Sequence, residues 1–381
     1  PRGRLAVIVV DALDECGGRD GRRSAHREGL LQTLKRWSNV SKQFKLIVTS
    51  RIEDDIARVL SPISEGIDLS TGSRVKEQAS ADIKLFLHAR FAKVAKLYPD
   101  SLEPDWPGDA VIDELTLRAA GLFLWAKTAI AFVNLGEPNE QLNLLLQGSG
   151  AGLGDVALLY EKVLRMSFRA PSADVLQAFQ GIVGAVIFAK RPLTRDECLK
   201  LLPYPPSMLD FVRMGLRSVL DTSGPGEEGL DVLRFSHQSF VEFLLNSEHC
   251  PEEFRIEEMK QHRNLALVCL KIMAKELRFN IAEFPTSYAK NVAMVDLDYR
   301  AETLVGTALI YACRFWMDHV FVLPFDEEIF DLIKVVILDK FLFWLEVLSL
   351  TGDIYSANAV LKFLFGWCKV RILRHYRRTP R

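Results

Sequence analysis

The sequence has almost no net charge and no closely spaced pair of cysteines. The 48 Lys and Arg residues almost balance the 49 Asp and Glu residues, which argues against a nucleic-acid or membrane partner that binds by charge alone. The six cysteines are scattered, without a CxxC pair or a zinc-ligand spacing, so we expect reduced, buried thiols in a cytoplasmic protein. With 49% apolar and 25% charged residues, the 381 residues are enough to bury the cores of two or three domains.

An apolar run long enough to cross a membrane is also missing. Residues 119–135 are apolar but carry Lys127 at their centre and fall short of the roughly 20 residues that a span needs. Residues 335–350 include three charged side chains. We therefore expect two buried helices and no membrane partner. No secretory signal peptide opens the chain, and it enters an apolar segment almost at once after Pro1, as a chain cut from a longer one would.

Two apolar runs on either side of a helical pattern make up the first part of the chain. Residues 5–10 read LAVIVV, which is typical of a strand buried on both faces of a parallel sheet. A helical pattern at 24–37 and a second strand-like run at 44–50 complete a βαβ unit, which we expect to cross over right-handed. A helix from residue 52 and a short strand at 67–69 are expected next. The fold class expected for this part is α/β.

Helical periodicity dominates the rest of the chain. A Gly-rich stretch at 148–154 is the best candidate for an internal boundary. Thr194, three residues before Glu197, predicts a capping box at the start of a helix. A hairpin expected within 219–235, with helices before and after it, is typical of a winged helix. The expected domains are an α/β part, a helical domain, a winged helix and a C-terminal helical region: 1–75, 76–150, 155–250 and 251–381.

An acidic cluster ends the first strand. Asp11, Asp14 and Glu15 follow the apolar run, which places carboxylates at the carboxyl end of a parallel strand, where open α/β sheets bind ligands. Asp11 is a candidate magnesium ligand, because Mg²⁺ is commonly held by one or two carboxylates and keeps part of its water shell. Asp14 and Glu15 are candidates to orient or deprotonate an attacking water. The alternative is a solvated acidic turn.

Polar residues also end the second strand. Thr49, Ser50 and Arg51 follow the apolar run, and they reach the same rim as Asp11 if the two strands are parallel neighbours. Arginine suits a γ-phosphate there, because its guanidinium is a fixed cation with a planar fork of donors. The alternative is an arginine that ends a strand in solvent.

Five sequence blocks carry a family resemblance. In order they read VIVVDALDE, KLIVTSR, DIKLFLHARF, GLFLWAKTAI and RFSHQSFVEFL. Together they resemble the NACHT class of STAND ATPases, above all the fungal, NLR-like set in which this module precedes WD or other repeats. The resemblance spans roughly residues 5–245, with a weaker continuation at 343–350. It implies part of the parallel sheet of a P-loop NTPase, followed by a helical domain and a winged helix that close over the nucleotide.

The same resemblance implies a function and its cofactors. Such proteins are switches that are locked by ADP, released by ATP with Mg²⁺, and active as homo-oligomers with protein partners. Asp11, with Asp14 and Glu15, corresponds to the Walker B acidic cluster. Arg51 corresponds to the sensor arginine, and the two hydroxyl residues before it lie beside the phosphate.

The resemblance also concerns one histidine of this sequence and one loop that the sequence lacks. His237 corresponds to the winged-helix histidine that contacts the β-phosphate of ADP in the closed state, and an imidazole N–H is a suitable donor. The alternative is an ordinary histidine at a helix start. The family's GxxxxGK[ST] loop is absent, since Gly-Lys-Ser or Gly-Lys-Thr occurs nowhere in the sequence. Most phosphate-binding amides and the lysine are therefore lacking.

A winged helix also raises the question of DNA binding. The helix expected at 208–218 offers only Arg213 and Arg217 as cations, and we expect its apolar residues in the core: Phe211, Val212, Met214 and Leu216. The sequence thus favours a nucleotide-dependent signalling switch, incomplete over these residues. The rival is a helical interaction scaffold that has lost nucleotide binding, and a metabolic hydrolase ranks third.

Overall fold

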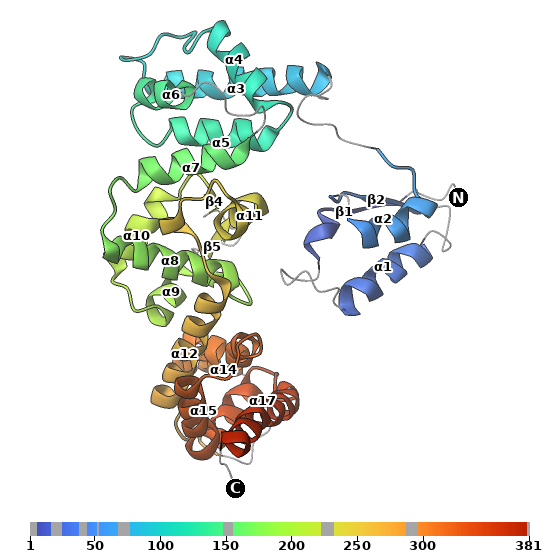
Figure 1. The fold of residues 1–381 in the computed structure, drawn as a ribbon, viewed down its shortest axis with the longest axis vertical. Helices are drawn as coiled ribbons and strands as arrows, with labels where there is room; N and C mark the ends of the chain where they lie inside the picture. Colours follow the sequence, from blue (N-terminus) through green and yellow to red (C-terminus); the bar gives the residue numbers. More distant parts are fainter. Residues whose placement is uncertain are drawn as a thin grey trace. The chain divides into compact units, whose positions relative to one another are not determined.

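The computed structural model describes most of the chain. The described residues are 6–16, 25–37, 44–51, 53–67, 77–147, 155–221, 232–286, 291, 294 and 296–378. They fall into two compact units, residues 1–70 and 71–381, each of which is described by itself (Figure 1).

The first unit is built on a β–α–β crossover. Strands β1 (Ala6–Val10) and β2 (Phe44–Val48) pair in parallel, with Val10 opposite Val48. The other elements are a 3-10 turn, two helices and a second turn: η1 (Leu13–Glu15), α1 (Ala25–Trp37), α2 (Asp54–Leu60) and η2 (Ser61–Ile63). The expectation of parallel, adjacent strands is confirmed. Of the strand expected at 67–69, only Ile67 is described, and it lies outside any strand.

Among the described residues of this unit, only one face of the small sheet is covered. One side packs against five buried residues of η1, α1 and α2: Leu13, Leu31, Leu34, Ile56 and Leu60. On the other side, Val7, Val9 and Ile47 are 51%, 62% and 51% exposed. The expectation of strands buried on both faces is therefore wrong, because α1 and α2 pack on the same side and the described residues supply no layer for the other.

The second unit is helical at its start. Its first helices are α3 (Glu77–Leu97), α4 (Asp109–Ala119), α5 (Phe123–Val133), α6 (Pro138–Leu146) and α7 (Val156–Ser167). Residues 119–135 contain the largely buried helix α5, as expected. Helix α7 joins this part to the next, because Leu159 and Val163 enter the core of α3–α6 while Tyr160 and Leu164 enter the following core.

A small antiparallel sheet follows. The region 173–246, called the wing region below, consists of α8 (Ala173–Phe188), β3 (Leu193–Thr194), α9 (Arg195–Leu201), α10 (Pro206–Gly215), β4 (Leu220–Asp221), β5 (Val232–Phe235) and α11 (Gln238–Asn246). The sheet order is β3-β5-β4. The expected hairpin is confirmed as the antiparallel pair β4–β5, and so is the capping box between Thr194 and Glu197. The short strand β3 was not expected.

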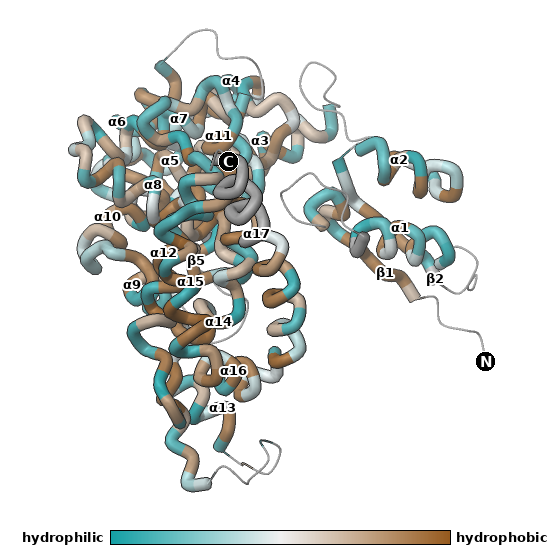
Figure 2. Tube along the Cα trace, turned by 60° about the horizontal axis from the view of Figure 1, so that its bottom comes forward, coloured by the Kyte–Doolittle hydropathy of each residue, from teal (hydrophilic) through white to brown (hydrophobic). Residues whose placement is uncertain are grey.

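Helices fill the remainder of the unit. They are η4 (Glu252–Phe254), α12 (Glu258–Glu276), α13 (Leu297–Arg300), the π-helical η6 (Ala301–Gly306), α14 (Thr307–Val320), α15 (Glu327–Asp339), α16 (Phe341–Leu350) and α17 (Ser356–Arg378). Hydrophobic residues recur along α14 and α16 in Figure 2, and one core is continuous from α7 to α17. Residues 335–350 are only partly buried, since Leu338 and Leu342 are exposed. No helix within the described residues is long and apolar enough to cross a membrane.

Four cysteines lie in this second core: Cys198, Cys250, Cys269 and Cys313. Burial raises the pKa of the first three thiols to about 12, so these sulfurs stay protonated and unreactive at neutral pH. The expectation of buried, reduced thiols is confirmed for these four.

Candidate functional site

The carboxyl ends of β1 and β2 meet at one rim. The amide of Thr49 donates to the carbonyl of Val10 at 3.0 Å, and the amide of Leu13 donates to the carbonyl of Thr49 at 3.0 Å. These two bonds extend the parallel ladder by one step past each strand. They hold the turn that carries the acidic cluster beside the turn that carries the hydroxyl and guanidinium groups.

Asp11 and Thr49 are in direct contact at this rim. The Thr49 hydroxyl donates to Asp11 Oδ1 and accepts from the amide of Ala12 at 2.9 Å. Ala12 has the left-handed dihedrals φ 50° and ψ 52°, which cost free energy in a residue with a Cβ. The bond from its amide to Thr49 helps to hold this conformation. The exposed Asp11 carboxylate is thereby fixed in direction while it stays open to solvent.

Asp14 and Arg51 form a second pair across the same rim. The Arg51 amide donates to Asp14 Oδ1 at 3.0 Å, and its Nε lies 3.5 Å from Asp14 Oδ2. The Asp14 side chain is 9% exposed, whereas that of Arg51 is 49% exposed. The carboxylate is thus fixed by two donors, and the guanidinium stands at the surface.

Glu15 and Ser50 stand apart from these two pairs. Glu15 is exposed at the end of η1, and within the described residues no side-chain bond joins it to the rim. The Ser50 hydroxyl donates to the carbonyl of Arg51 at 2.7 Å, which is a local contact in its own turn. The structure therefore brings together Asp11, Asp14, Thr49 and Arg51, and leaves the other two expected residues as neighbours in sequence only.

Arg27 of α1 holds the acidic turn of the rim in place through hydrogen bonds. Its Nη1 donates to the carbonyls of Asp14 at 2.9 Å and Cys16 at 3.2 Å. Its Nε donates to Asp55 at 2.9 Å, and Nη2 pairs with Glu53. Burial by itself would lower the pKa of Arg27, but hydrogen bonds and charges from Asp55 and Glu53 outweigh this effect and raise it. The acidic turn is thereby tied to the start of α2.

Sequence reasoning missed Arg27. It lies 13 residues from Asp14 and 28 from Asp55 along the chain, so only the packing of α1 against α2 brings the three together. A hollow of about 360 Å³ opens next to it, lined by residues of both helices: Arg27, Glu28, Leu31, Gln32, Asp55, Arg58 and Val59. Charges of both signs line this hollow, which gives it no preference for an anion.

The rim offers few oxygen ligands for a magnesium ion. The part of the chain that the structure describes contains no group of three or more His, Cys, Asp or Glu side chains that could hold a metal. Mg²⁺ in nucleotide sites, however, is bound by one or two carboxylates, by waters and by phosphate. Asp11 supplies one exposed carboxylate and Thr49 one hydroxyl, so the residues fit an ion that a nucleotide brings with it.

His237 lies in the second unit, at the start of α11. It is the N-cap residue, and its Nδ1 accepts from the amide of Ser239 at 3.1 Å and lies 2.8 Å from the Ser239 hydroxyl. That hydroxyl is 2.9 Å from the hydroxyl of the buried Tyr160. Because a backbone amide can only donate, Nδ1 is the acceptor and the proton of the neutral ring is on Nε2. Capping therefore gives His237 a structural role, and its predicted phosphate contact stays a prediction.

Helix α10 departs from its expected burial. Val212 and Leu216 are buried as expected, but Phe211 and Met214 are 47% and 60% exposed. The expectation that all four lie in the core is wrong, because α10 packs on α8 along one stripe only. Arg217 donates to the carbonyl of Asn134 at 2.9 Å, so the helix presents apolar side chains and few cations.

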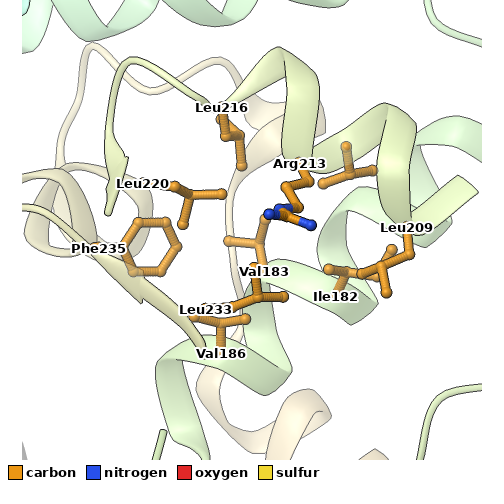
Figure 3. A pocket seen from close by; sticks show the side chains of 10 residues that line it. Ile182, Val183, Val186, Leu209, Arg213, Leu216, Leu220, Leu233 and Phe235 are labelled. Carbon is orange, nitrogen blue, oxygen red and sulfur yellow. The ribbon is translucent and has the colours of Figure 1, made fainter. Parts of the chain in front are cut away.

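A small pocket lies behind α10. Figure 3 shows Arg213 among apolar side chains of α8, α10 and the strands, such as Val183, Leu216 and Leu233. Its volume of about 10 Å³ is at the lower limit for a single water molecule. A nucleotide does not fit there.

Comparisons with known proteins add no identification. The sequence matches no family model, and searches of the curated proteins and of the solved structures gave no match either.

Proposed function

We propose that this chain is part of a nucleotide-dependent signalling switch of the NACHT type, in which the rim of β1 and β2 faces the phosphates. The single observation that supports it best is the parallel pairing of the two strands, which brings Asp11 into contact with Thr49 and Asp14 into contact with Arg51. In an open α/β sheet this rim is where ligands bind. ADP locks the switch and ATP releases it to form a homo-oligomer with protein partners in the cytoplasm.

Each rim residue has a role in this proposal. Asp11, assisted by Thr49, holds the magnesium ion, which neutralises phosphate charge when it is bound. Arg51 contacts the γ-phosphate by shifting its half-exposed guanidinium away from the largely buried carboxylate of Asp14. Asp14 is then released to orient a water molecule, and Glu15 and Ser50 assist at the edge of the same rim. His237 donates from Nε2 to the β-phosphate of ADP.

A helical interaction scaffold is the alternative. It is supported by the pairing of Arg51 with Asp14, which satisfies both groups without any phosphate, and by the extent of the helical second unit. In a scaffold the rim is only a solvated turn between two strand ends.

Nucleotide retention by the protein of the complete gene distinguishes the two. We expect ADP to co-purify with it, to be detected by chromatography of the denatured protein, and ATP with Mg²⁺ to increase the particle size. Asp11→Asn should reduce Mg-ATP affinity at least tenfold, the equivalent of roughly 1.4 kcal/mol or more for a charged contact. Asp54→Asn, at an exposed position of α2, is the matched control and should bind as the wild type does.

Residues 1–381 alone are expected to behave differently. They lack a Gly-Lys-Ser/Thr loop, and carboxylates repel phosphate unless cations and amide donors offset them. Titration calorimetry with Mg-ATP should therefore show no saturable binding below the millimolar range. If the complete protein retains no nucleotide and does not respond to ATP, the scaffold is the correct assignment.

A further inference from the structure

Two histidines face each other inside the second unit. His262 of α12 and His319 of α14 are 3% and 0% exposed, and their Nδ1 atoms are 3.1 Å apart. Helices α12 and α14 pack closely along their length. A bond between two imidazole nitrogens requires one to donate and the other to accept, so the protonation state of each ring is constrained by the other.

A buried tyrosine decides which ring donates. The amide of Lys190, just beyond α8, donates to the hydroxyl oxygen of Tyr311 at 3.2 Å, and that hydroxyl lies 3.0 Å from His319 Nε2. A buried O–H without an acceptor is costly, and His319 Nε2 is the acceptor that the structure places beside it. The Tyr311 hydroxyl therefore donates to Nε2. His319 must then carry its proton on Nδ1 and donate to His262 Nδ1.

This chain of hydrogen bonds works only with two neutral rings. A proton added to Nδ1 of His262 turns the acceptor into a second donor, and two N–H groups then face each other across 3.1 Å. A proton added to Nε2 of His319 opposes the Tyr311 hydroxyl in the same way. Burial lowers the pKa of His319 to about 3, and His262, when it is protonated, and Lys190 lower it in the same direction. This agrees with a neutral His319 ring at physiological pH.

The chain joins two parts of the unit. Lys190 belongs to the wing region, whereas His262 and His319 belong to the helices that follow it. The Phe188 ring packs on the His262 ring with centroids 5.0 Å apart, and the Arg191 guanidinium lies 5.5 Å from the centroid of the Tyr311 ring. The residues at the end of α8 are thus joined to α12 and α14 through groups whose hydrogen bonds depend on protonation.

Several titratable groups surround the chain. Glu258 of α12 has its Oε1 3.9 Å from Nε2 of His262, and its side chain is 56% exposed. Arg191 is bound by two bonds to the buried Glu197 of α9, at 2.8 and 2.5 Å. Asp318 and Cys269 also act electrostatically on Tyr311, and Lys190 acts on His319. Glu258 is the carboxylate placed to stabilise a protonated His262, so the protonated state has a partner at the solvent edge.

We propose that His262, His319 and Tyr311 form an acid-sensitive latch between the wing region and helices α12 and α14, closed while both rings are neutral and opened by one proton. The closed state is stabilised by the continuous hydrogen-bond chain, and the open state by the ion pair of His262 with Glu258. The two states therefore respond oppositely to protons, which is the requirement for a switch. The inference does not depend on nucleotide binding.

The pH dependence of unfolding tests the latch. His319 is neutral when folded and titrates near its ordinary value of about 6.5 when unfolded, so stability is complete above that pH and is lost as the pH falls toward 3. Between pH 7.5 and 5.5 this one group should lower the folding equilibrium constant roughly tenfold. We expect that tenfold loss for the wild type but not for His319→Gln, whose amide oxygen keeps an acceptor for Tyr311.

Matched variants separate the latch from general effects. His249→Asn removes a histidine of the same unit whose side chain is 51% exposed, and it should keep the wild-type pH dependence. His262→Asn keeps an acceptor at the Nδ1 position without a titrating ring, and it serves where His319→Gln does not fold. In His262→Asn, the Lys190 amide should stay protected from hydrogen exchange at pH 5.5 as well as at pH 7.5.

Two direct readouts decide the question in the wild type. At pH 7.5, ¹⁵N spectra of labelled histidine should show two neutral rings of opposite tautomer, protonated on Nδ1 in His319 and on Nε2 in His262. On acidification to pH 5.5, exchange protection after correction for the intrinsic rate should fall first at Lys190 and along α14, and later in α3–α5. Equal pH dependence of wild type and His319→Gln, or a uniform loss of protection, would overturn the latch.

Discussion

The two units of this chain differ in where their polar side chains lie and in how these are held. In the first, the polar side chains stand at the exposed ends of two strands and are held by one another, above a core of five buried residues. In the second, histidine, tyrosine and glutamate side chains lie inside a continuous core and are bonded there. Exposed polar groups can exchange partners at little cost, whereas buried ones are tied to the packing around them. The first arrangement suits a binding site, and the second suits a structural joint.

The largest effect is expected for a tryptophan in the core of the second unit. Trp344 is fully buried, packs edge-on against Trp316 with centroids 6.1 Å apart, and donates to the carbonyl of Cys313 at 3.0 Å. Trp344→Ala removes this contact area and leaves a cavity, which should cost about 3–5 kcal/mol. Hydrogen exchange measured peptide by peptide should show the loss in α12–α16. Equal loss in β1 and α1 would mean that the two units unfold together.

A smaller loss, confined to the first unit, is expected at Arg27. Arg27→Met keeps the aliphatic stem but removes the hydrogen bonds that the guanidinium donates to Glu53, to Asp55 and to the carbonyl of Asp14. Breaking a largely buried ion pair from one side should cost about 2–4 kcal/mol. Exchange of the β1, β2 and α1 amides should accelerate, while that of α12 and α14 stays unchanged. Arg58→Met, on the exposed side of α2, is the control and should change neither.

Much of the first unit could be predicted from local patterns. The apolar runs predicted parallel neighbouring strands, and the residues after them predicted that Asp11 and Arg51 share a rim, as the structure shows. Local patterns also predicted the capping box at Thr194 and the hairpin that ends at Phe235. The capping box depends on two residues three positions apart. The paired strands are further apart in sequence, but each strand is marked by its own apolar run. Such features leave a periodic or positional signal in the sequence.

The remaining features depend on contacts between distant segments. An apolar run predicts that a strand can be buried, but only the placement of helices decides whether Val9 is covered. Arg27 and the pair His262–His319 act across 11–57 residues of sequence, so neither has a local signal. Phe211 and Met214 are apolar as well, but they lie on the face of α10 away from the buried Leu209 and Val212, so they stay at the surface. In each case the three-dimensional packing decides the role, and the composition of the segment does not.

A still smaller effect is expected next to His237, the residue proposed to donate a hydrogen bond to the phosphate. Tyr160→Phe removes the hydroxyl that bonds Ser239 and should cost about 1 kcal/mol. The His237 ring should keep its proton on Nε2, because the amide of Ser239 still donates to Nδ1. ¹⁵N spectra of labelled histidine give the tautomer, and urea titration gives the stability. Tyr204→Phe, which loses a bond to the carbonyl of Gln177, is the control for a missing hydroxyl. A ring protonated on Nδ1 would contradict the capping geometry.

The smallest effect tests the bare face of the sheet directly. Val9→Thr replaces a methyl group by a hydroxyl of similar size at a position that is 62% exposed. A hydroxyl in water needs no protein partner, and threonine favours strands as valine does, so the change should alter stability by less than about 0.5 kcal/mol. The same substitution at the fully buried Val347 should cost about 1–3 kcal/mol, because its hydroxyl loses water. Local unfolding free energies from hydrogen exchange measure both in one experiment on each variant. If Val9→Thr costs as much as Val347→Thr, then the β1 face is covered in solution. The sheet of the first unit would then be covered on both faces. Burial would no longer explain why the two units hold their polar side chains differently.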